Sequence, residues 1–152
     1  MRLIQRLLTI LISCLIIVAC AGDSSNPEQQ VRNSLQAIEE AAEKRSMADF
    51  MRYISDDYSD DQGNDKKTLR QLVQYLFLRN QNINIFSLIR SIEINDESAT
   101  VELSAAMASR DVDLSQESNR LKADTQRFAV ILGPNKNNTV WLIKSASWKR
   151  GW

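Results

Sequence analysis

The sequence predicts an α+β domain in which N-terminal helices pack on one face of a curved, four-stranded antiparallel sheet. Apolar side chains recur at helical spacing in the first part of the chain, up to about residue 79. After residue 80 they alternate with polar side chains, which is typical of half-buried strands. Helices that come first and strands that follow them favour an α+β fold. About 130 residues beyond the N-terminal segment suffice for one core.

Polar side chains mark the start of two helices. Asn26 is expected to cap the first helix, with Pro27 at its first position, and the helix should run to about Lys44. In "SMAD", Ser46 should cap a short second helix while Asp49 reaches back to it. The apolar stripe of the first helix consists of Val31, Leu35, Ile38 and Ala42.

A third helix is expected from about Asp65 to Arg79. Its apolar side chains fall at i, i+3, i+4, i+7 and i+8, the clearest helical period in the chain. We therefore expect Leu72 and Leu76 to face the core. The positions of this stripe are Leu69, Leu72, Val73, Leu76 and Phe77.

Between the second and third helices lies the acidic stretch "SDDYSDDQGND", which is expected to be a loop. A calcium loop of the EF-hand type needs oxygen ligands at set positions around a glycine. With Gly63 as that glycine, Tyr58 and Leu69 would occupy the first and last ligand positions, so the pattern does not fit. We expect a solvated loop whose Asp65 caps the third helix, and no metal site.

Four strands are expected after the third helix, at about residues 83–94, 99–107, 128–132 and 140–148. In the first of them the alternation slips at Leu88 and Ile89, which predicts a bulge. The polar stretch 109–124 is too long for a tight hairpin. We expect it at the rim of the sheet, either as part of a binding site or as an extended connection.

Two tryptophans lie in the last predicted strand. Trp141 and Trp148 have opposite parity, so they should face opposite sides of the sheet. Trp148 shares its face with Leu142 and Ala146, which favours the core. Trp141 is then the candidate for an exposed aromatic that binds a ligand or partner. The alternative is that Trp141 packs beneath the first helix.

The N-terminus has the layout of a secretory signal, because Arg2 and Arg6 precede an apolar run that ends at Ala19. The run is shorter than the ~20 residues that a membrane-spanning helix needs. The sequence "IVAC" at its end resembles the lipobox of bacterial lipoproteins. This resemblance implies that residues 1–19 are removed and that the thiol of Cys20 carries diacylglycerol, a membrane anchor.

A lipid on Cys20 would hold the domain, residues 27–152, close to a membrane. The lipidated cysteine and its tether are residues 20–26, and the tether reaches about 20 Å when extended. Ala21 stands where enterobacterial lipoproteins kept at the inner membrane carry aspartate, so the resemblance implies the periplasmic side of the outer membrane. An ordinary secretory signal cut elsewhere and an uncleaved anchor helix are the alternatives.

The composition excludes several common mechanisms. The chain has no histidine, which is the usual general base near neutral pH and the commonest metal ligand. Cys14 leaves with the signal and Cys20 is used by the lipid, so no thiol remains for a disulfide, a metal or a nucleophile. The mature chain carries slightly more acidic than basic side chains, so nucleic acid is not expected as a partner.

The order of the predicted elements, and especially "DFMRYISDDYSDDQGNDKKTLRQLVQYLFLRNQNI", resembles bacterial members of the nuclear transport factor 2-like superfamily. In these proteins a bent sheet wraps around a long helix to form a cone. The resemblance spans residues 28–148, but many members have a small strand pair where this chain has the acidic stretch. Enzymatic members use a carboxylate base and a tyrosine donor. The matching candidates are Asp57 with Tyr53 or Tyr58, unless the tyrosine is packed in the core.

The sequence favours a non-catalytic binding module of the bacterial envelope. It would hold a small apolar ligand or an envelope protein, with Trp141 or Tyr58 as contact residues. A second copy of the chain against the sheet face is another candidate partner, and no cofactor is expected. The alternative is a histidine-free isomerase or dehydratase with Asp57 as the base and a tyrosine as the donor.

Overall fold

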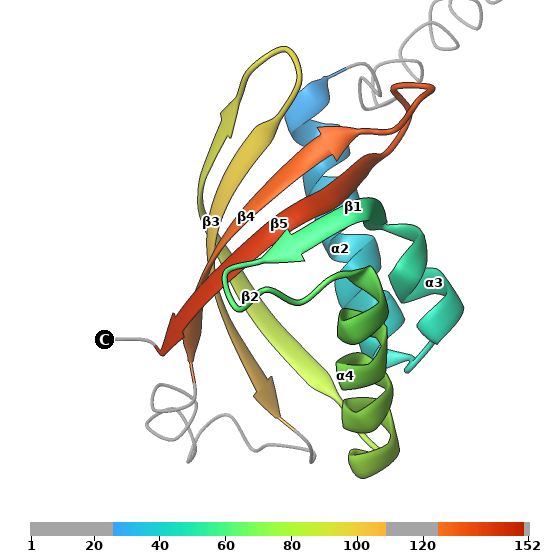
Figure 1. Cartoon of the computed structure of the whole chain (residues 1–152). Helices are drawn as coiled ribbons and strands as arrows, with labels where there is room; N and C mark the ends of the chain where they lie inside the picture. The colour runs from blue at the N-terminus through green and yellow to red at the C-terminus, as the bar shows by residue number, and fades with distance from the viewer. Residues whose placement is uncertain (1–25, 109–124, 151–152) are drawn as a thin grey trace, which may run out of the picture.

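A computed structural model of the chain describes residues 26–108 and 125–150 (Figure 1). Residues 1–25, with the predicted signal segment and Cys20, the polar stretch 109–124 and residues 151–152 lie outside the described residues. Within the described ranges, no helix has the length and apolar character needed to cross a membrane. The elements are α2 (Pro27–Glu43), α3 (Met47–Arg52), β1 (Ile54–Asp60), α4 (Lys66–Arg79), β2 (Asn84–Ile94), β3 (Ala99–Ala108), β4 (Gln126–Pro134) and β5 (Trp141–Arg150).

The strands form one curved sheet in the order β1-β5-β4-β3-β2 (Figure 1). Strands β2 to β5 pair antiparallel with their neighbours, and β1 adds to the edge parallel to β5. The helices pack on the concave face. The predicted α+β class, with helices on a curved sheet, is confirmed, but the sheet is mixed and has one strand more than predicted.

The additional strand is the stretch that was expected to be an acidic loop. In β1, Ile54 and Tyr58 are buried while Asp56 and Asp57 are exposed. The prediction failed because charged side chains are common on exposed positions of edge strands, where they discourage pairing with other chains. An isolated bridge between Ser59 and Asp65 adds to the pairing here, so this region is not a plain loop.

The predicted helix starts are confirmed. The Asn26 side chain accepts a hydrogen bond from the Glu28 N–H at 2.9 Å. The Asp65 carboxylate accepts one from the Thr68 N–H at 2.7 Å. Ser46 caps α3, and its hydroxyl donates to the Asp49 carboxylate at 2.6 Å. Short-range polar contacts therefore set where all three described helices begin.

The main core lies where α2 covers one end of the sheet. Val31 and Leu35 of α2 pack against buried side chains of β3, β4 and β5. A smaller cluster, Met51, Ile54 and Tyr58, joins α3 to β1 and contacts Leu69 of α4 and Ile143 of β5. The strand side chains of the main core are Ala99, Val101, Leu103, Val130, Leu132 and Trp141.

Helix α4 does not bury the two leucines, Leu72 and Leu76, that were predicted to face the core. Leu72 is 46% exposed and Leu76 is 40% exposed, whereas Val73 is buried. The helical register is correct, but α4 packs against α3 and β1 and not across the sheet. The buried stripe therefore runs through Val73 and the half-buried Leu69 and Phe77. The expectation that Leu72 and Leu76 are core residues is wrong.

Two bulges interrupt the antiparallel strands. The bulge predicted in the first antiparallel strand is present, but it lies between Ile89 and Ser91 and leaves Arg90 unpaired in the ladder. A second bulge in β5, which was not predicted, leaves Lys144 without a partner because Ile143 pairs with Leu132 and Ser145 pairs with Ile131. An extra residue of this kind reverses the in-and-out alternation of the side chains that follow it.

Candidate ligand-binding cavity

A cavity of about 530 Å³ lies at the end of the sheet where β2 begins and β3 ends. Strands β2, β3 and β4 form one wall, and Leu76 of α4 lines the other side. In Figure 1, α4 stands opposite the ends of β2 and β3. We call this space the cone cavity, and its described lining residues are Leu76, Ile85, Ala105, Ala106, Met107, Gln126 and Phe128.

The strand register gathers these side chains on the concave face. Ile85 pairs with Met107, and Ala105 pairs with Gln126. Directly paired residues point to the same side of a sheet. Phe128 packs on the main core and against Trp148, with ring centroids 6.4 Å apart. Ala105 contributes only a small side chain to this wall, and the cavity continues from the core as a space that no side chain of the described residues fills.

The described lining of the cone cavity is chemically simple. The Gln126 amide is the polar side chain among apolar ones, and no ionisable side chain of the described residues lines the space. Such a cavity favours an apolar molecule, and the amide can donate and accept one or two hydrogen bonds that orient it. The described lining residues supply no acid or base, although the Glu43 carboxylate at the end of α2 accepts a hydrogen bond from the Ile85 N–H at 2.9 Å.

The structure does not bring the predicted catalytic residues together. Asp57 and Tyr58 are neighbours in β1, so their side chains point to opposite faces, and Asp57 is exposed while Tyr58 is buried. Tyr53 ends α3, and its carbonyl accepts a hydrogen bond from the Ile143 N–H at 2.8 Å. None of the three lines the cone cavity.

Tyr58 belongs to the fold. Burial raises the pKa of Tyr58 to about 12, and the Asp60 carboxylate, to which the hydroxyl donates a hydrogen bond, adds to the effect. The hydroxyl therefore stays protonated at neutral pH and ties the small core cluster to the end of β1. Tyr58 is thus the tyrosine that packs in the core, which was the alternative to a catalytic role. Because it does not line the cone cavity, the geometry does not support Tyr58 as a ligand contact.

Asp60 closes the turn that follows β1. Its carboxylate accepts hydrogen bonds from the Gln62 N–H at 3.0 Å, from the Asn64 N–H at 2.8 Å and from the Asn64 side chain at 2.9 Å. Burial alone would raise the pKa of Asp60, but the hydrogen bonds from Asn64 and Gln62 outweigh it and lower the pKa. Gly63 permits the turn because its φ of 81° lies in the left-handed region.

The other aspartates of this stretch also have structural roles. Asp56 forms an ion pair with Lys66 at 2.8 Å, and the same ammonium donates to the Ile54 carbonyl at 2.7 Å. Asp65 caps α4, as predicted. Across the described ranges, no three side chains of the metal-ligating kinds come together closely enough to hold an ion.

Trp141 is not the exposed aromatic that its parity predicted. It is 5% exposed, and it lies beneath α2 in the main core. Its backbone N–H donates to the Ser34 hydroxyl, and its indole N–H donates to the Gln30 side chain, both at 3.2 Å. The bulge at Lys144 explains the error, because it places Trp141 and Trp148 on the same face in spite of their opposite parity. The alternative of packing beneath the first helix is the correct one.

The residues of the cone cavity were not identified as a site from the sequence. Ile85, Met107 and Phe128 follow the same alternation as the core residues of their strands, so the pattern cannot distinguish a cavity wall from a core. A cavity arises where the opposite layer stands away from the sheet. The distance between α4 and the sheet is a tertiary property that no local pattern reports.

No family model and no curated protein matches the chain. Among solved structures, a domain of unknown function with a cystatin-like fold from Nostoc punctiforme has a TM-score of 0.64 at 11% identity, covering 84% of this chain and 79% of that one. A candidate dehydratase of the nuclear transport factor 2-like family from Streptomyces avermitilis has a TM-score of 0.63 at 12% identity, covering 82% and 95%.

Bd1075 from Bdellovibrio bacteriovorus has a TM-score of 0.64 at 9% identity, with 80% of this chain covered. The chain matches 39% of the length of Bd1075. Likeness at such low identity establishes the architecture and not the activity. The chain therefore has the cystatin-like cone fold of nuclear transport factor 2-like proteins.

Proposed function

We propose that the protein is a non-catalytic binding module that holds a small apolar ligand in the cone cavity. The observation that carries the proposal is the cavity itself, which has a volume of about 530 Å³ and apolar walls. Ligand sites commonly occupy about 300 to 1,000 Å³, with mostly apolar walls and a few polar groups that fix orientation. Gln126 supplies such a group at the level of Ala105.

The mouth of the cavity supports entry from solvent. Leu76 and Met107 are 40% and 44% exposed, although both side chains line the cavity. Leu72 lies one helical turn before Leu76 on the same side of α4 and continues the apolar surface outward. An apolar ligand would cover these side chains and gain hydrophobic free energy by removing them from water.

An enzymatic role has weaker support. The likeness to a candidate dehydratase favours it, but general acid–base chemistry needs a titratable group within hydrogen-bond reach of the substrate. Asp57 is exposed on β1, away from the cavity, and the described lining contains no such group. An Asp57→Asn substitution should therefore leave the binding of a ligand in the cavity unchanged.

The cavity can be tested with a neutral fluorescent probe such as N-phenyl-1-naphthylamine and the full chain. Leu76→Gln puts a polar amide in the wall and should weaken probe binding roughly tenfold, since burying a leucine side chain contributes about 1.5 to 3 kcal/mol. Leu78→Gln is the matched control, because Leu78 is on the same helix, is largely exposed and does not line the cavity. Equal effects of the two substitutions would exclude binding in the cone cavity.

We further propose that the module is anchored to the periplasmic side of the outer membrane through a lipid on Cys20. The support is the order of the charged start, the apolar run and the lipobox-like "IVAC". Cys20→Ser should abolish incorporation of radiolabelled palmitate and leave unprocessed precursor in the membrane fraction. Unchanged labelling and processing of this variant would show that the anchor is not on Cys20.

A further inference from the structure

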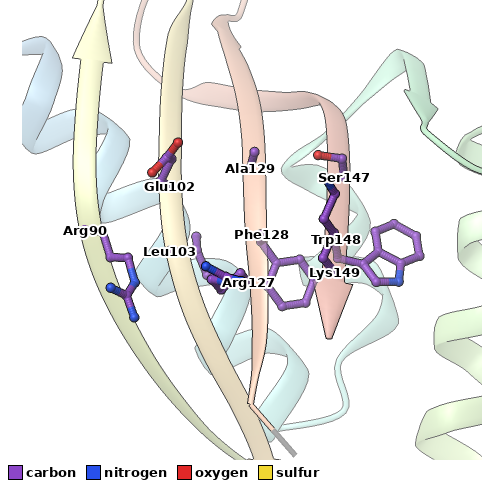
Figure 2. A pocket seen from close by; sticks show the side chains of 9 residues that line it. All are labelled: Arg90, Glu102, Leu103, Arg127, Phe128, Ala129, Ser147, Trp148 and Lys149. Carbon is purple, nitrogen blue, oxygen red and sulfur yellow. The ribbon is translucent and has the colours of Figure 1, made fainter. Parts of the chain in front are cut away.

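A second, charged groove lies on the convex face of the sheet, opposite the helices. It has a volume of about 250 Å³ and is distinct from the cone cavity. Arg127 alternates along β4 with Phe128, which packs on the core, so the Arg127 side chain belongs to the convex face. Figure 2 shows the groove residues on four adjacent strands, with Arg90 on β2, Glu102 on β3, Arg127 on β4 and Lys149 on β5.

Three cations of this groove form a row across the sheet. Arg127 and Lys149 are directly paired between β4 and β5, and Ser104 of β3 pairs with Arg127 on its other side. The Arg90 guanidinium donates to the Ser104 hydroxyl at 2.8 Å, and this hydrogen bond places Arg90 at the β2 end of the row. Neighbouring strands are about 4.8 Å apart, so adjacent cations are close enough to contact one anion together.

The charges of this groove favour an anion. Like charges directly opposite each other in a sheet destabilise it, and Arg127 and Lys149 form no ion pair with any described residue. Glu102 is the acidic side chain of the groove, but it pairs with Ala129, one row away, and likewise forms no ion pair in the described ranges.

We propose that the row of Arg90, Arg127 and Lys149 binds the phosphate group of a small organic phosphate or of a lipid headgroup. A guanidinium can donate two parallel hydrogen bonds to a phosphate, and a nearby ammonium adds a compact positive charge. Ala129 and Ser147 are small side chains beside the row, so a phosphate group has space there, and the Ser147 hydroxyl is a further donor. Glu102, one row away, would repel a ligand that carries a second negative charge at that position.

The test uses the full chain and isothermal titration calorimetry with two probes. Glycerol 3-phosphate represents a soluble phosphate, and dihexanoyl phosphatidylglycerol, below its micelle concentration, represents a lipid headgroup. Arg127→Gln should weaken binding at least roughly tenfold, because it removes the charge-assisted hydrogen bonds of the guanidinium to the phosphate. Lys136→Gln is the matched control, since this exposed cation lies in the turn at the other end of the β4–β5 pair.

A second variant separates binding from folding. Lys149→Glu places an acid opposite Arg127, so it should abolish phosphate binding while leaving the thermal midpoint equal to or above that of the parent chain. Binding of both probes assigns the site to phosphate in general, and binding of the lipid probe alone assigns it to a headgroup. The proposal is overturned if neither probe binds, or if Lys149→Glu and Lys136→Gln have the same effect.

Discussion

The concave face has the same strand pattern at both ends, but one end is packed core and the other lines the cone cavity. We call them the closed end and the open end. On β3, Val101 is fully buried, whereas Met107, on the same face six residues later, is 44% exposed. The difference lies in the opposite layer, since Val31 and Leu35 of α2 pack on the first end, whereas the second end faces the cone cavity, with Leu76 of α4 across it. Alternation along a strand therefore identifies the inner face, while the covering helix decides whether that face becomes core or cavity.

The two long helices differ in how they are attached. Helix α2 is fixed to the sheet by Val31 and Leu35, and by the hydrogen bond from the Trp141 N–H to Ser34. Helix α4 is attached to β1 and α3, through the Asp60 turn, the packing of Leu69 and the edge-to-face contact of Phe77 with Phe50, while Leu76 lines the open end. The closed end is thus filled by packed side chains, whereas the open end retains a cavity.

The largest expected effect is at the closed end. Leu132 has no exposed surface, so Leu132→Ala should lower the free energy of unfolding by about 2 to 5 kcal/mol. Met107→Ala, at the open end of the same sheet, should cost less than about 1 kcal/mol because Met107 is already partly in water. Urea denaturation of both variants measures the difference, and equal losses would contradict the distinction between the two ends.

The next effect concerns the turn that sets the start of α4. Asp60→Ala removes the acceptor for the N–H groups of Gln62 and Asn64 and should cost about 1 to 3 kcal/mol. If this turn positions α4 over the open end, the variant should also weaken binding of the naphthylamine probe. A loss of stability with unchanged probe binding would show that the packing of Leu69 positions α4 without the turn.

The lowered pKa of Asp60 predicts that the stability of the protein depends on pH. The folded protein holds the pKa of Asp60 below its ordinary value, so the unfolded chain takes up the proton first as pH falls. The stabilisation by Asp60 is therefore fully present above the unfolded pKa and is lost as pH decreases through the folded pKa. Asp60→Asn should unfold with a shallower loss of stability in this acidic range than the parent chain, measured by urea midpoints at successive pH values.

What could be predicted from the sequence is mostly what neighbouring residues decide. The caps at Asn26, Ser46 and Asp65 were correct because capping depends on side chains within one turn of the helix. The α+β class was correct because it needs only the order of the two periodicities. Neither prediction depends on how distant parts of the chain pack together.

The predictions failed where residues distant in the sequence determine the local structure. Residues 54–60 become a strand because β5 offers a free edge, and their aspartates hide the alternation. The face of Trp141 was wrong because a single extra residue, Lys144, shifts the register against β4. The cone cavity was not found because its walls follow the same alternation as the core, and the packing of the opposite layer decides whether they are covered.

A smaller effect tests the attachment of α2. Ser34→Ala removes the hydroxyl that accepts the buried Trp141 N–H and should cost about 1 kcal/mol. Ser87→Ala is the control, because Ser87 is an exposed serine on β2 and should change stability by less than about 0.5 kcal/mol. A Ser34→Ala variant as stable as the control would mean that apolar packing alone fixes α2 to the closed end.

The smallest expected effect compares two adjacent residues of α4. Leu72 is 46% exposed and Val73 is 7% exposed, so the helix buries one and presents the other to solvent. Leu72→Ala should change the free energy of unfolding by less than about 0.5 kcal/mol, since alanine's better helix propensity offsets the little apolar contact that is lost. Val73→Ala removes two buried methyl groups and should cost about 1.5 kcal/mol. If Leu72→Ala proved the more damaging of the two, α4 would have to pack across the open end, and the cone cavity would be closed.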